Sequence, residues 1–230
     1  MIKSVPRHNK VALVDFDGVI FRNNRVHSLI KKRINSYVGK VLKSENAIAV
    51  DRVNEYLYNT YGHTLLGLER IVGKEQAGSL YQFNKFVYSD VNIDRDDYYD
   101  IRRELHDWEV FVTKCKLNNV PIYIFSNAPK DWCLNFIEEE TISGFVGDNL
   151  PTDSELLKPE MRIFEMVDTW FSDKTIFFVD DKIHNMKYTV NNDKWVNIVF
   201  DTETSQNMLK VKDKFFISKN LNACGDLICF

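Results

Sequence analysis

The sequence predicts an α/β protein built on a doubly wound, Rossmann-like parallel sheet that carries an inserted all-helical domain. Three short apolar runs indicate the sheet: VALVDF from Val11, PIYIFSN from Pro121 and TIFFVDD from Thr175. Continuous apolar runs of this length are typical of strands buried on both faces. Helical segments separate the later runs, and this alternation implies crossover connections between parallel strands. A long interval without any such run indicates the helical insertion.

That interval lies between the first two strands and has the periodicity of helices. Apolar residues recur at three- and four-residue steps over residues 27–42, 47–62, 75–90 and 96–114. Helices that simply pack on the sheet as a crossover are the alternative, but one crossover rarely needs about eighty residues. We therefore predict an α/β core formed by residues 1–23 and 108–230, with a helical insertion at 24–107.

The second half of the chain alternates between strand-like and helix-like segments. Beyond the strands from Pro121 and Thr175, further strands are expected from Gly144 (GFVGD) and from Lys194 (KWVNIVFD). Helical segments are expected over residues 130–140, 158–171 and 182–192. After Asp201, TETSQNMLKVKDKFF predicts a short helix, and ISKNLNACGDLICF fits either a further edge strand or a tail tied to the core.

Composition narrows the classes of function. A formal net charge of −3 supplies no general attraction to nucleic acid polymers or to anionic membranes. The polar start, MIKSVPRHNK, does not resemble a signal peptide, and no apolar stretch is long enough to span a bilayer. Four scattered cysteines do not form a disulfide scaffold or a zinc motif, which predicts a reduced, cytoplasmic protein. Cys224 and Cys229 are close enough in sequence to form a disulfide in principle, but we expect both to remain buried or unreactive thiols.

Two pairs of aspartates end strands of the predicted sheet. Asp15 and Asp17 follow the first run, and an extended chain would turn both to one side. Asp180 and Asp181 end the third run. Because the carboxyl ends of such strands meet at one crevice, up to four carboxylates would gather there, which suits Mg²⁺. The purely structural alternatives are a solvated turn at Asp17 and a helix cap at the second pair.

Two further polar residues lie where an anion could bind. Ser126 ends the second strand and Asn127 begins the turn into the next helix, so that a hydroxyl and backbone N–H groups could hold a phosphate. Lys158 precedes Pro159, which favours an extended Lys158 and suits the first position of a helix. Taken singly, Ser126 is better explained as a helix cap and Lys158 as a surface lysine.

Taken together, these motifs resemble those of the haloacid dehalogenase superfamily of phosphohydrolases, over nearly the whole chain. The four matching segments, in order, are Asp15-Phe16-Asp17-Gly18-Val19, Ser126, Lys158-Pro159 and Asp180-Asp181. Their order and their places at strand ends make the resemblance specific, although each segment is weak alone.

The resemblance implies a separate catalytic or binding role for each of these residues. Asp15 would be the nucleophile that takes the phosphoryl group, and Asp17 the general acid and then the base that activates water. Ser126 and Asn127 would hold the phosphoryl oxygens, and Lys158 would offset their charge. Mg²⁺ would bind Asp15, the backbone carbonyl of Asp17, Asp181 directly, and Asp180 directly or through water. Members of the family with a second aspartate are typically phosphatases or phosphotransferases, so Asp17 argues against dehalogenation.

The predicted helical insertion lies where this family places its C1 cap, a lid over small phosphorylated substrates. The segment YLYNTYGHTLLGL, Tyr56 to Leu68, resembles the Tyr-Gly-x-Thr-x-x-Gly-Leu segment of the pyrimidine 5′-nucleotidase-like branch. This predicts a nucleoside monophosphate as substrate, with Tyr61, His63 and Arg70 as candidate contacts. The alternative is that Gly62 and Gly67 only end and start helices, with Thr64 as a cap.

Three classes of function remain in competition. The first is a Mg²⁺-dependent phosphatase, and the second is a phosphomutase or phosphotransferase acting on a sugar phosphate or phosphoglycolate. The third is a non-catalytic binding protein on the same fold, which would have no need for all of the motif residues. The expected partner is a small phosphorylated molecule, with no nucleic acid polymer and no membrane, and the expected state is a monomer or homodimer.

Overall fold

The computed structural model describes residues 9–146 and 154–230, which fall into two compact units. Unit 1 is formed by Met1–Arg22, Ile101–Val146 and Phe164–Phe230, and unit 2 by Asn23–Asp100 and Gly147–Ile163. The predicted absence of a signal peptide concerns the start of the chain, which lies largely outside the described residues. The predicted cap boundaries, 24 and 107, stay a prediction.

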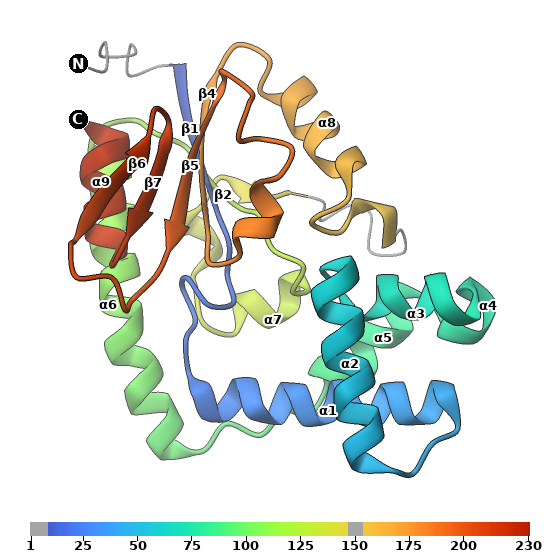
Figure 1. Cartoon of the computed structure of the whole chain (residues 1–230). Coiled ribbons are helices and arrows are strands. Elements are labelled where there is room, and N and C mark those ends of the chain that lie inside the picture. Colours follow the sequence, from blue (N-terminus) through green and yellow to red (C-terminus); the bar gives the residue numbers. More distant parts are fainter. Residues whose placement is uncertain (1–8, 147–153) are drawn as a thin grey trace. The chain divides into compact units, whose positions relative to one another are not determined.

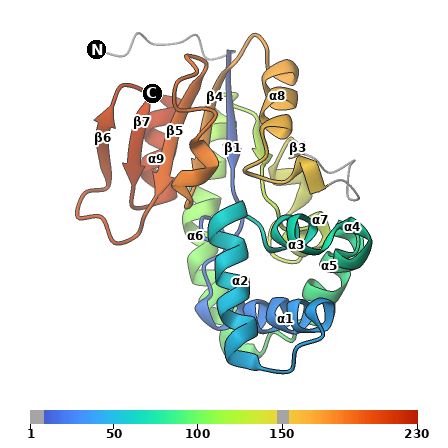
Figure 2. The ribbon, with the colours of Figure 1, turned by 45° about the vertical axis from the view of Figure 1, so that its right-hand side comes forward.

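Unit 1 contains a seven-stranded sheet in the order β3-β2-β1-β4-β5-β7-β6 (Figure 1; β3 is labelled in Figure 2). Neighbouring strands are parallel, except that β6 and β7 are antiparallel. The predicted α/β parallel-sheet class is therefore confirmed. The strands are β1 (Lys10–Val14), β2 (Ile122–Ile124), β3 (Gly144–Phe145), β4 (Thr175–Asp180), β5 (Trp195–Phe200), β6 (Met208–Lys212) and β7 (Phe215–Ser218).

Helices cover both faces of this sheet, which is why its central strands read as unbroken apolar runs. Successive residues of β4 point to opposite faces. Phe178 packs against Phe164 of α8 (Met161–Trp170), with ring centroids 6.0 Å apart. Phe177 faces the other way, 5.6 Å from the ammonium of Lys10, and that ammonium donates to Ile228 O of α9 (Leu221–Cys229). Helix α9 runs beside the unit 1 part of α6 (Arg95–Leu117) in both views (Figures 1 and 2).

Several predicted elements of the second half are shorter than expected or differ in kind. The segment 130–140 forms α7 (Lys130–Leu134) and the 3₁₀ turn η2 (Glu139–Thr141). The helix predicted over 182–192 is wrong beyond one 3₁₀ turn, η4 (Ile183–Met186), because Asn185 there bonds back to Asp180. Helix α8 begins at Met161, two residues after Pro159, so Pro159 is not its first residue. A further 3₁₀ turn, η3, spans Ser154–Leu156.

The last predicted helix, within residues 202–216, is also wrong. This segment contains β6 and the start of β7, which pair as an antiparallel hairpin. Alternation of Lys210 and Lys212 with Leu209 and Val211 suits an edge strand, because lysines on an edge discourage pairing with other chains. The end of the chain is not an edge strand, since β7 lies between β5 and β6. It is tied to the core, as the other alternative predicts, but as helix α9, whose Ile228 O accepts from Lys10 Nζ of β1.

The 23–100 segment of unit 2 is helical, as predicted. Its helices are α1 (Asn24–Leu42), α2 (Ala47–Tyr61), α3 (Thr64–Val72), α4 (Lys74–Ala77) and α5 (Leu80–Tyr88). The segment predicted as one helix over 75–90 is two, because Gly78 has φ +82° and Ser79 begins α5 with a capping box. Among the described residues, no helix is both long enough and apolar enough to cross a membrane.

Candidate active site

The carboxyl ends of β1 and β4 bring two of the predicted aspartates together. Val14 pairs with Val179, and Asp15 N continues the ladder by donating to Val179 O at 2.9 Å. The same register places Asp15 beside Asp180, and both side chains point to the α8 face because each lies one residue beyond that pair. On the other side of β1, Phe125 N donates to Val14 O at 2.9 Å. Backbone pairing on both sides therefore fixes where Asp15 leaves the sheet.

The chain then turns sharply instead of continuing as a strand. Asp15 Oδ1 accepts from Phe16 N at 2.7 Å, and Phe16 O accepts from the N–H groups of Ile20 and Phe21, each at 2.9 Å. The rings of Phe16 and Phe21 stack with centroids 5.8 Å apart and an interplanar angle of 4°. The extended geometry expected from Asp15 to Asp17 is therefore absent. A buried aromatic pair holds the turn that carries Asp17.

Gly18 is required at this turn for two reasons. Its φ is +85°, which side-chain-bearing residues rarely adopt. A Cβ built on Gly18 would lie 2.5 Å from Asp181 Oδ2. The backbone beside Asp17 therefore lies directly against the Asp181 carboxylate, so the first and fourth motifs meet through main chain as well as through side chains.

The second acidic pair divides into one fixed and one more exposed carboxylate. Asp180 has no exposed surface, and its oxygens accept from Lys182 N at 2.8 Å and from Asn185 Nδ2 at 3.0 and 2.9 Å. No side chain caps η4, whose N-cap is Lys182, so the cap alternative is wrong; Asp180 instead holds the residues that lead into the turn. The side chain of Asp181 is 18% exposed and forms an ion pair with Lys182 Nζ at 2.7 Å.

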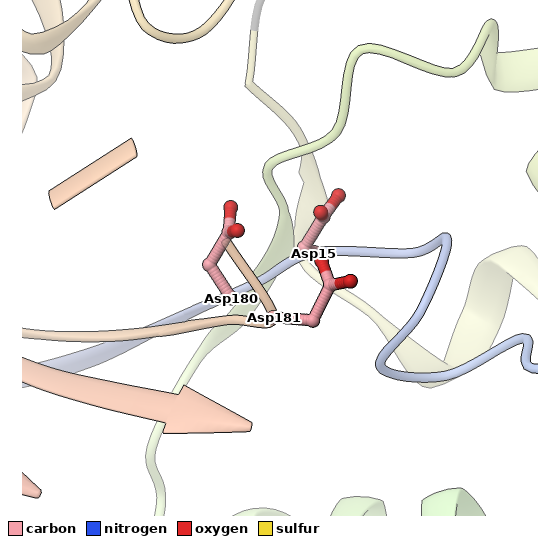
Figure 3. A group of neighbouring side chains, drawn as sticks. All are labelled: Asp15, Asp180 and Asp181. Atoms are coloured by element: carbon pink, nitrogen blue, oxygen red, sulfur yellow. The ribbon is translucent and has the colours of Figure 1, made fainter. Parts of the chain in front are cut away.

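Asp15, Asp180 and Asp181 form one acidic cluster (Figure 3). One oxygen from each lies within 4.8 Å of the others. Like charges this close repel unless a cation or strong hydrogen bonds offset them. An all-oxygen donor set of three carboxylates is the type that Mg²⁺ prefers. The cluster therefore fits the predicted metal, and the predicted contact of the Asp17 backbone carbonyl with that metal stays a prediction.

Ser126 lies two residues beyond β2 and closes its turn. Its Oγ accepts a hydrogen bond from Ala128 N at 3.2 Å. Helix α7 begins at Lys130 after Pro129, with no side-chain cap, so the cap interpretation of Ser126 is wrong. Ser126 and Asn127 are half-buried, and β2 is a direct neighbour of β1. Their predicted role in holding a phosphate stays a prediction.

Lys158 groups with unit 2 and follows the η3 turn. Only 1% of its surface is exposed, so the interpretation as a surface lysine is wrong. The Lys158–Pro159 bond is cis. A buried ammonium needs anionic or hydrogen-bonding partners. Its predicted action on the phosphoryl group stays a prediction.

The residues singled out in unit 2 are mainly engaged in helix ends. His63 is the N-cap of α3, its Nδ1 accepting from Leu65 N at 3.2 Å, and burial lowers its pKa to about 4. Thr64 is therefore not the cap; its hydroxyl donates to Asn54 Oδ1 at 2.6 Å. Gly62 ends α2, as the alternative predicts. Gly67 starts no helix, because it lies within α3, where a Cβ would be 2.7 Å from Leu57 Cδ2.

Tyr61 and Arg70 occupy different surroundings in the same region. Tyr61 is half-buried at the last position of α2, and Arg70 is exposed in the last turn of α3. Neither position tests a substrate contact, which stays a prediction for both.

Two residues of the site have no counterpart in the sequence-based prediction. Asn185 orients Asp180, and Lys182 neutralises Asp181. A polar residue within one turn after an acidic strand end is the available signal for Asn185. Nothing in the sequence distinguishes Lys182 from other surface lysines.

Comparison with known proteins gives a fold but no sequence relative. No family model and no curated protein matches the sequence. The crystal structure of a HAD phosphatase from Thermococcus onnurineus is similar with a TM-score of 0.54 and 13% identity, covering 95% of this chain and 97% of that chain. The 2-haloacid dehalogenase from Pseudomonas syringae pv. Tomato DC3000 is similar with a TM-score of 0.50 and 10% identity, at the same coverage. Similarity at such identities concerns the fold alone, and the chain has the α/β fold of the haloacid dehalogenase (HAD) superfamily.

Proposed function

We propose that this protein is a Mg²⁺-dependent phosphomonoester hydrolase that works through an aspartyl-phosphate on Asp15. The observation that carries the proposal is the acidic cluster at the ends of β1 and β4, with the Gly18 turn against it. A single carboxylate at a strand end has many explanations. Three carboxylates within 4.8 Å of one another create a concentrated negative charge that a divalent cation would relieve.

Asp15 is the nucleophile in this proposal. Its position is fixed by backbone pairing on both sides of β1, and its Oδ1 already accepts from Phe16 N. This restrains one oxygen, so that the other can be presented for attack on phosphorus. When bound by Asp15, Asp180 and Asp181, Mg²⁺ would supply the positive charge that lets two anions approach each other.

Asp17 is the general acid and base. Asp15 becomes phosphorylated during the reaction, so a second group must protonate the leaving oxygen and then deprotonate the attacking water. Asp17 lies in the turn held by the Phe16–Phe21 stack. The HAD fold is shared by a phosphatase and a dehalogenase, so the fold does not choose between these reactions. The choice of phosphate rests on Asp17, by its resemblance to the phosphatase form of the first motif.

The proposed substrate is a small phosphorylated metabolite, first of all a nucleoside monophosphate. This finer proposal rests on unit 2 serving as the cap and on the resemblance of Tyr56 to Leu68 to the nucleotidase-like branch. Gly62, His63 and Thr64 of that segment are engaged at the α2–α3 corner. This leaves Tyr61 and, just beyond the segment, the exposed Arg70 as the side chains offered for recognition. Ser126, Asn127 and Lys158 complete the proposed phosphate site.

The test measures phosphate release by the purified protein from nucleoside monophosphates, sugar phosphates and phosphoglycolate, with Mg²⁺ and with EDTA. We expect Mg²⁺-dependent turnover with water alone, and an acid-stable phosphoryl label on the protein after a rapid quench. Asp15→Asn should lose both the label and at least about 10³-fold in kcat. Asp173→Asn, an exposed aspartate at the other end of β4, is the matched control and should change neither.

Three outcomes would contradict parts of this proposal. Absence of release from the whole panel, with Asp15→Asn unchanged in Mg²⁺ binding, would remove the hydrolase assignment. A label that is discharged only when a sugar phosphate is added would replace hydrolysis by phosphotransfer. Nucleotides that rank no better than sugar phosphates in kcat/KM would remove the nucleotidase assignment while leaving the hydrolase.

A further inference from the structure

Three of the four cysteines gather where α9 packs on α6. Cys115 lies on α6, and Cys224 and Cys229 lie on α9, with all three buried. The two helices approach closely because Gly225 faces α6; a Cβ there would lie 3.0 Å from Lys114 Cδ. The fold thereby brings residues 115 and 229, which are 114 positions apart in sequence, to an Sγ–Sγ distance of 4.0 Å.

The pair that the fold creates differs from the pair that is close in sequence. Cys224 and Cys229 are five positions apart and so lie on different sides of α9. Burial raises the pKa of Cys224 to about 12, and the pKa of Cys115 is raised as well, so the 4.0 Å approach of the two sulfur atoms, and not thiol acidity, selects Cys115 as the partner of Cys229. Cys229 instead shares a hydrogen bond with Cys115. The reactive combination is therefore Cys115 with Cys229.

The surroundings of Cys229 favour its thiolate. Its hydrogen bond with Cys115 is the main cause of a lowered pKa, and the ammonium groups of Lys10 and Lys114 add to it, while Asp226 and burial oppose it. Lys10 Nζ is fixed nearby, donating to Ile228 O at 2.7 Å. Lys114 Nζ donates to Asn222 O at 3.3 Å and forms an ion pair with Asp226. Cys115 has a raised pKa, chiefly from the same hydrogen bond and from burial.

Access also differs between the two sulfur atoms. Cys115 is completely buried on α6. Cys229 is 3% exposed and occupies the last turn of α9, next to Phe230, which is 77% exposed. The last turn of a helix opens more readily than its middle, because its carbonyl groups lack helical partners. A small oxidant would therefore meet Cys229 first.

We propose that Cys115 and Cys229 are a reversible oxidation site that a hydroperoxide converts to a disulfide. The Cys229 thiolate attacks the terminal peroxide oxygen, which breaks the O–O bond and gives a sulfenic acid, with hydroxide or water as the leaving group from hydrogen peroxide. Cys115 then attacks the Cys229 sulfur, its thiol proton and the sulfenic oxygen leaving as water. One equivalent of peroxide is reduced by two electrons for each disulfide formed.

The disulfide would tie the last helix of unit 1 to α6. The cross-link closes a long loop of chain, and closing a long loop restricts the unfolded state strongly. Both partners lie in unit 1, so the bond needs only the local approach of two helices already packed together. Unit 1 would then resist thermal unfolding in the oxidised form and return to its original stability on reduction.

The test treats the full-length protein with hydrogen peroxide, blocks remaining thiols with N-ethylmaleimide, and maps disulfides by peptide mass spectrometry without reduction. We expect loss of two of the four thiols, one linkage between the Cys115 and Cys229 peptides, and reversal by dithiothreitol. The midpoint of thermal unfolding should rise on oxidation, on the order of 10 °C.

Matched variants decide which sulfur atoms take part. Cys229→Ala and Cys115→Ala should each abolish the linkage and the thermal shift, whereas Cys133→Ala and Cys224→Ala should keep both. Cys229→Ala keeps the inference testable if Cys115→Ala fails to fold, because Cys229 lies at a helix end. A linkage between Cys224 and Cys229, or four intact thiols after oxidation, would overturn the inference. Phosphatase activity is not the readout, so the outcome is independent of the proposed function.

Discussion

The acidic strand ends of unit 1 and the α2–α3 corner of unit 2 use polar side chains in opposite ways. At the strand ends, three carboxylates lie within 4.8 Å of one another, and the charge is concentrated rather than dispersed. At the corner, His63 caps α3 and Thr64 donates to Asn54, so these polar groups serve the backbone and each other. The first arrangement costs free energy that a bound cation would recover, whereas the second stabilises a turn between helices. This difference is the reason for proposing that the chemistry takes place at the strand ends.

Replacement of Asp17 should give the largest effect and would test whether the strand ends do the chemistry proposed. Asp17→Asn removes the acid and base while keeping the shape, so kcat should fall by about 10²–10⁴-fold. The loss should be greater for alkyl phosphates than for p-nitrophenyl phosphate, because a good leaving group needs less protonation. Steady-state kinetics on both esters checks this, with Asp213→Asn in the exposed β6–β7 turn as the control. An equal loss on both esters would argue against Asp17 as the acid.

Replacement of Gly18 would break the contact between the first and fourth motifs. Gly18→Ala combines an unfavourable φ of +85° with a Cβ that meets Asp181. The backbone conformation alone should lower the free energy of unfolding by about 1–2 kcal/mol, and displacement of Asp181 should weaken Mg²⁺ binding as well. Gly73→Ala is the control, because Gly73 has φ +84° but open space around its Cβ position. Chemical denaturation should show a similar loss of stability in both variants. Titration with Mg²⁺ should show weaker binding in Gly18→Ala only.

Removal of the Asn185 side chain would test how the buried Asp180 and the more exposed Asp181 differ in their roles in the metal site. Asn185→Ala takes two hydrogen bonds from the buried Asp180 carboxylate, which should lower the free energy of unfolding by about 1–3 kcal/mol. The Mg²⁺ concentration for half-saturation should rise, because Asp180 loses its orientation. Asn222→Ala, on the exposed side of α9, should leave both quantities unchanged. Unchanged Mg²⁺ binding in Asn185→Ala would show that Asp180 does not take part in the metal site.

The smallest expected effect tests the α2–α3 corner. The pKa of His63 is lowered to about 4 from a usual value near 6.5, because burial disfavours the charged imidazole. Between these values the unfolded chain binds a proton that the folded chain does not, so His63 makes the protein less stable as pH falls through this window. His63→Asn keeps a preferred N-cap and removes this titration, so its stability at neutral pH should change by less than about 1 kcal/mol.

The measurement is urea denaturation at neutral pH and near pH 5. The parent protein should lose more stability on acidification than His63→Asn does. His106→Asn, at an exposed histidine of α6, should behave like the parent. Equal acid sensitivity of the parent and His63→Asn would contradict this, because it would show that the pKa of His63 is the same in the folded and unfolded states.

Sequence patterns correctly predicted the strands that are buried on both faces. They failed for segments whose structure depends on contacts with particular partner residues. The strands from Val11, Pro121 and Thr175 are present because both of their faces are covered, which leaves an unbroken apolar run to recognise. Strand β6 was missed because MLKVK has no such run and becomes a strand through its pairing with β7. The helix expected after Asp181 stops at one turn because Asn185 bonds to Asp180, which no periodicity reveals.

The chemistry-bearing residue types and their places at strand ends follow from the sequence alone, because a strand that ends in aspartate leaves a carboxylate at the edge of a sheet. Tertiary structure decided which of them meet. The register between β1 and β4 places Asp15 beside Asp180. The turn at Gly18 places the Gly18 backbone against the Asp181 carboxylate. The approach of α9 to α6 decided that Cys229 meets Cys115 and not Cys224. Contacts between residues distant in sequence depend on strand register and helix packing, which no local pattern encodes.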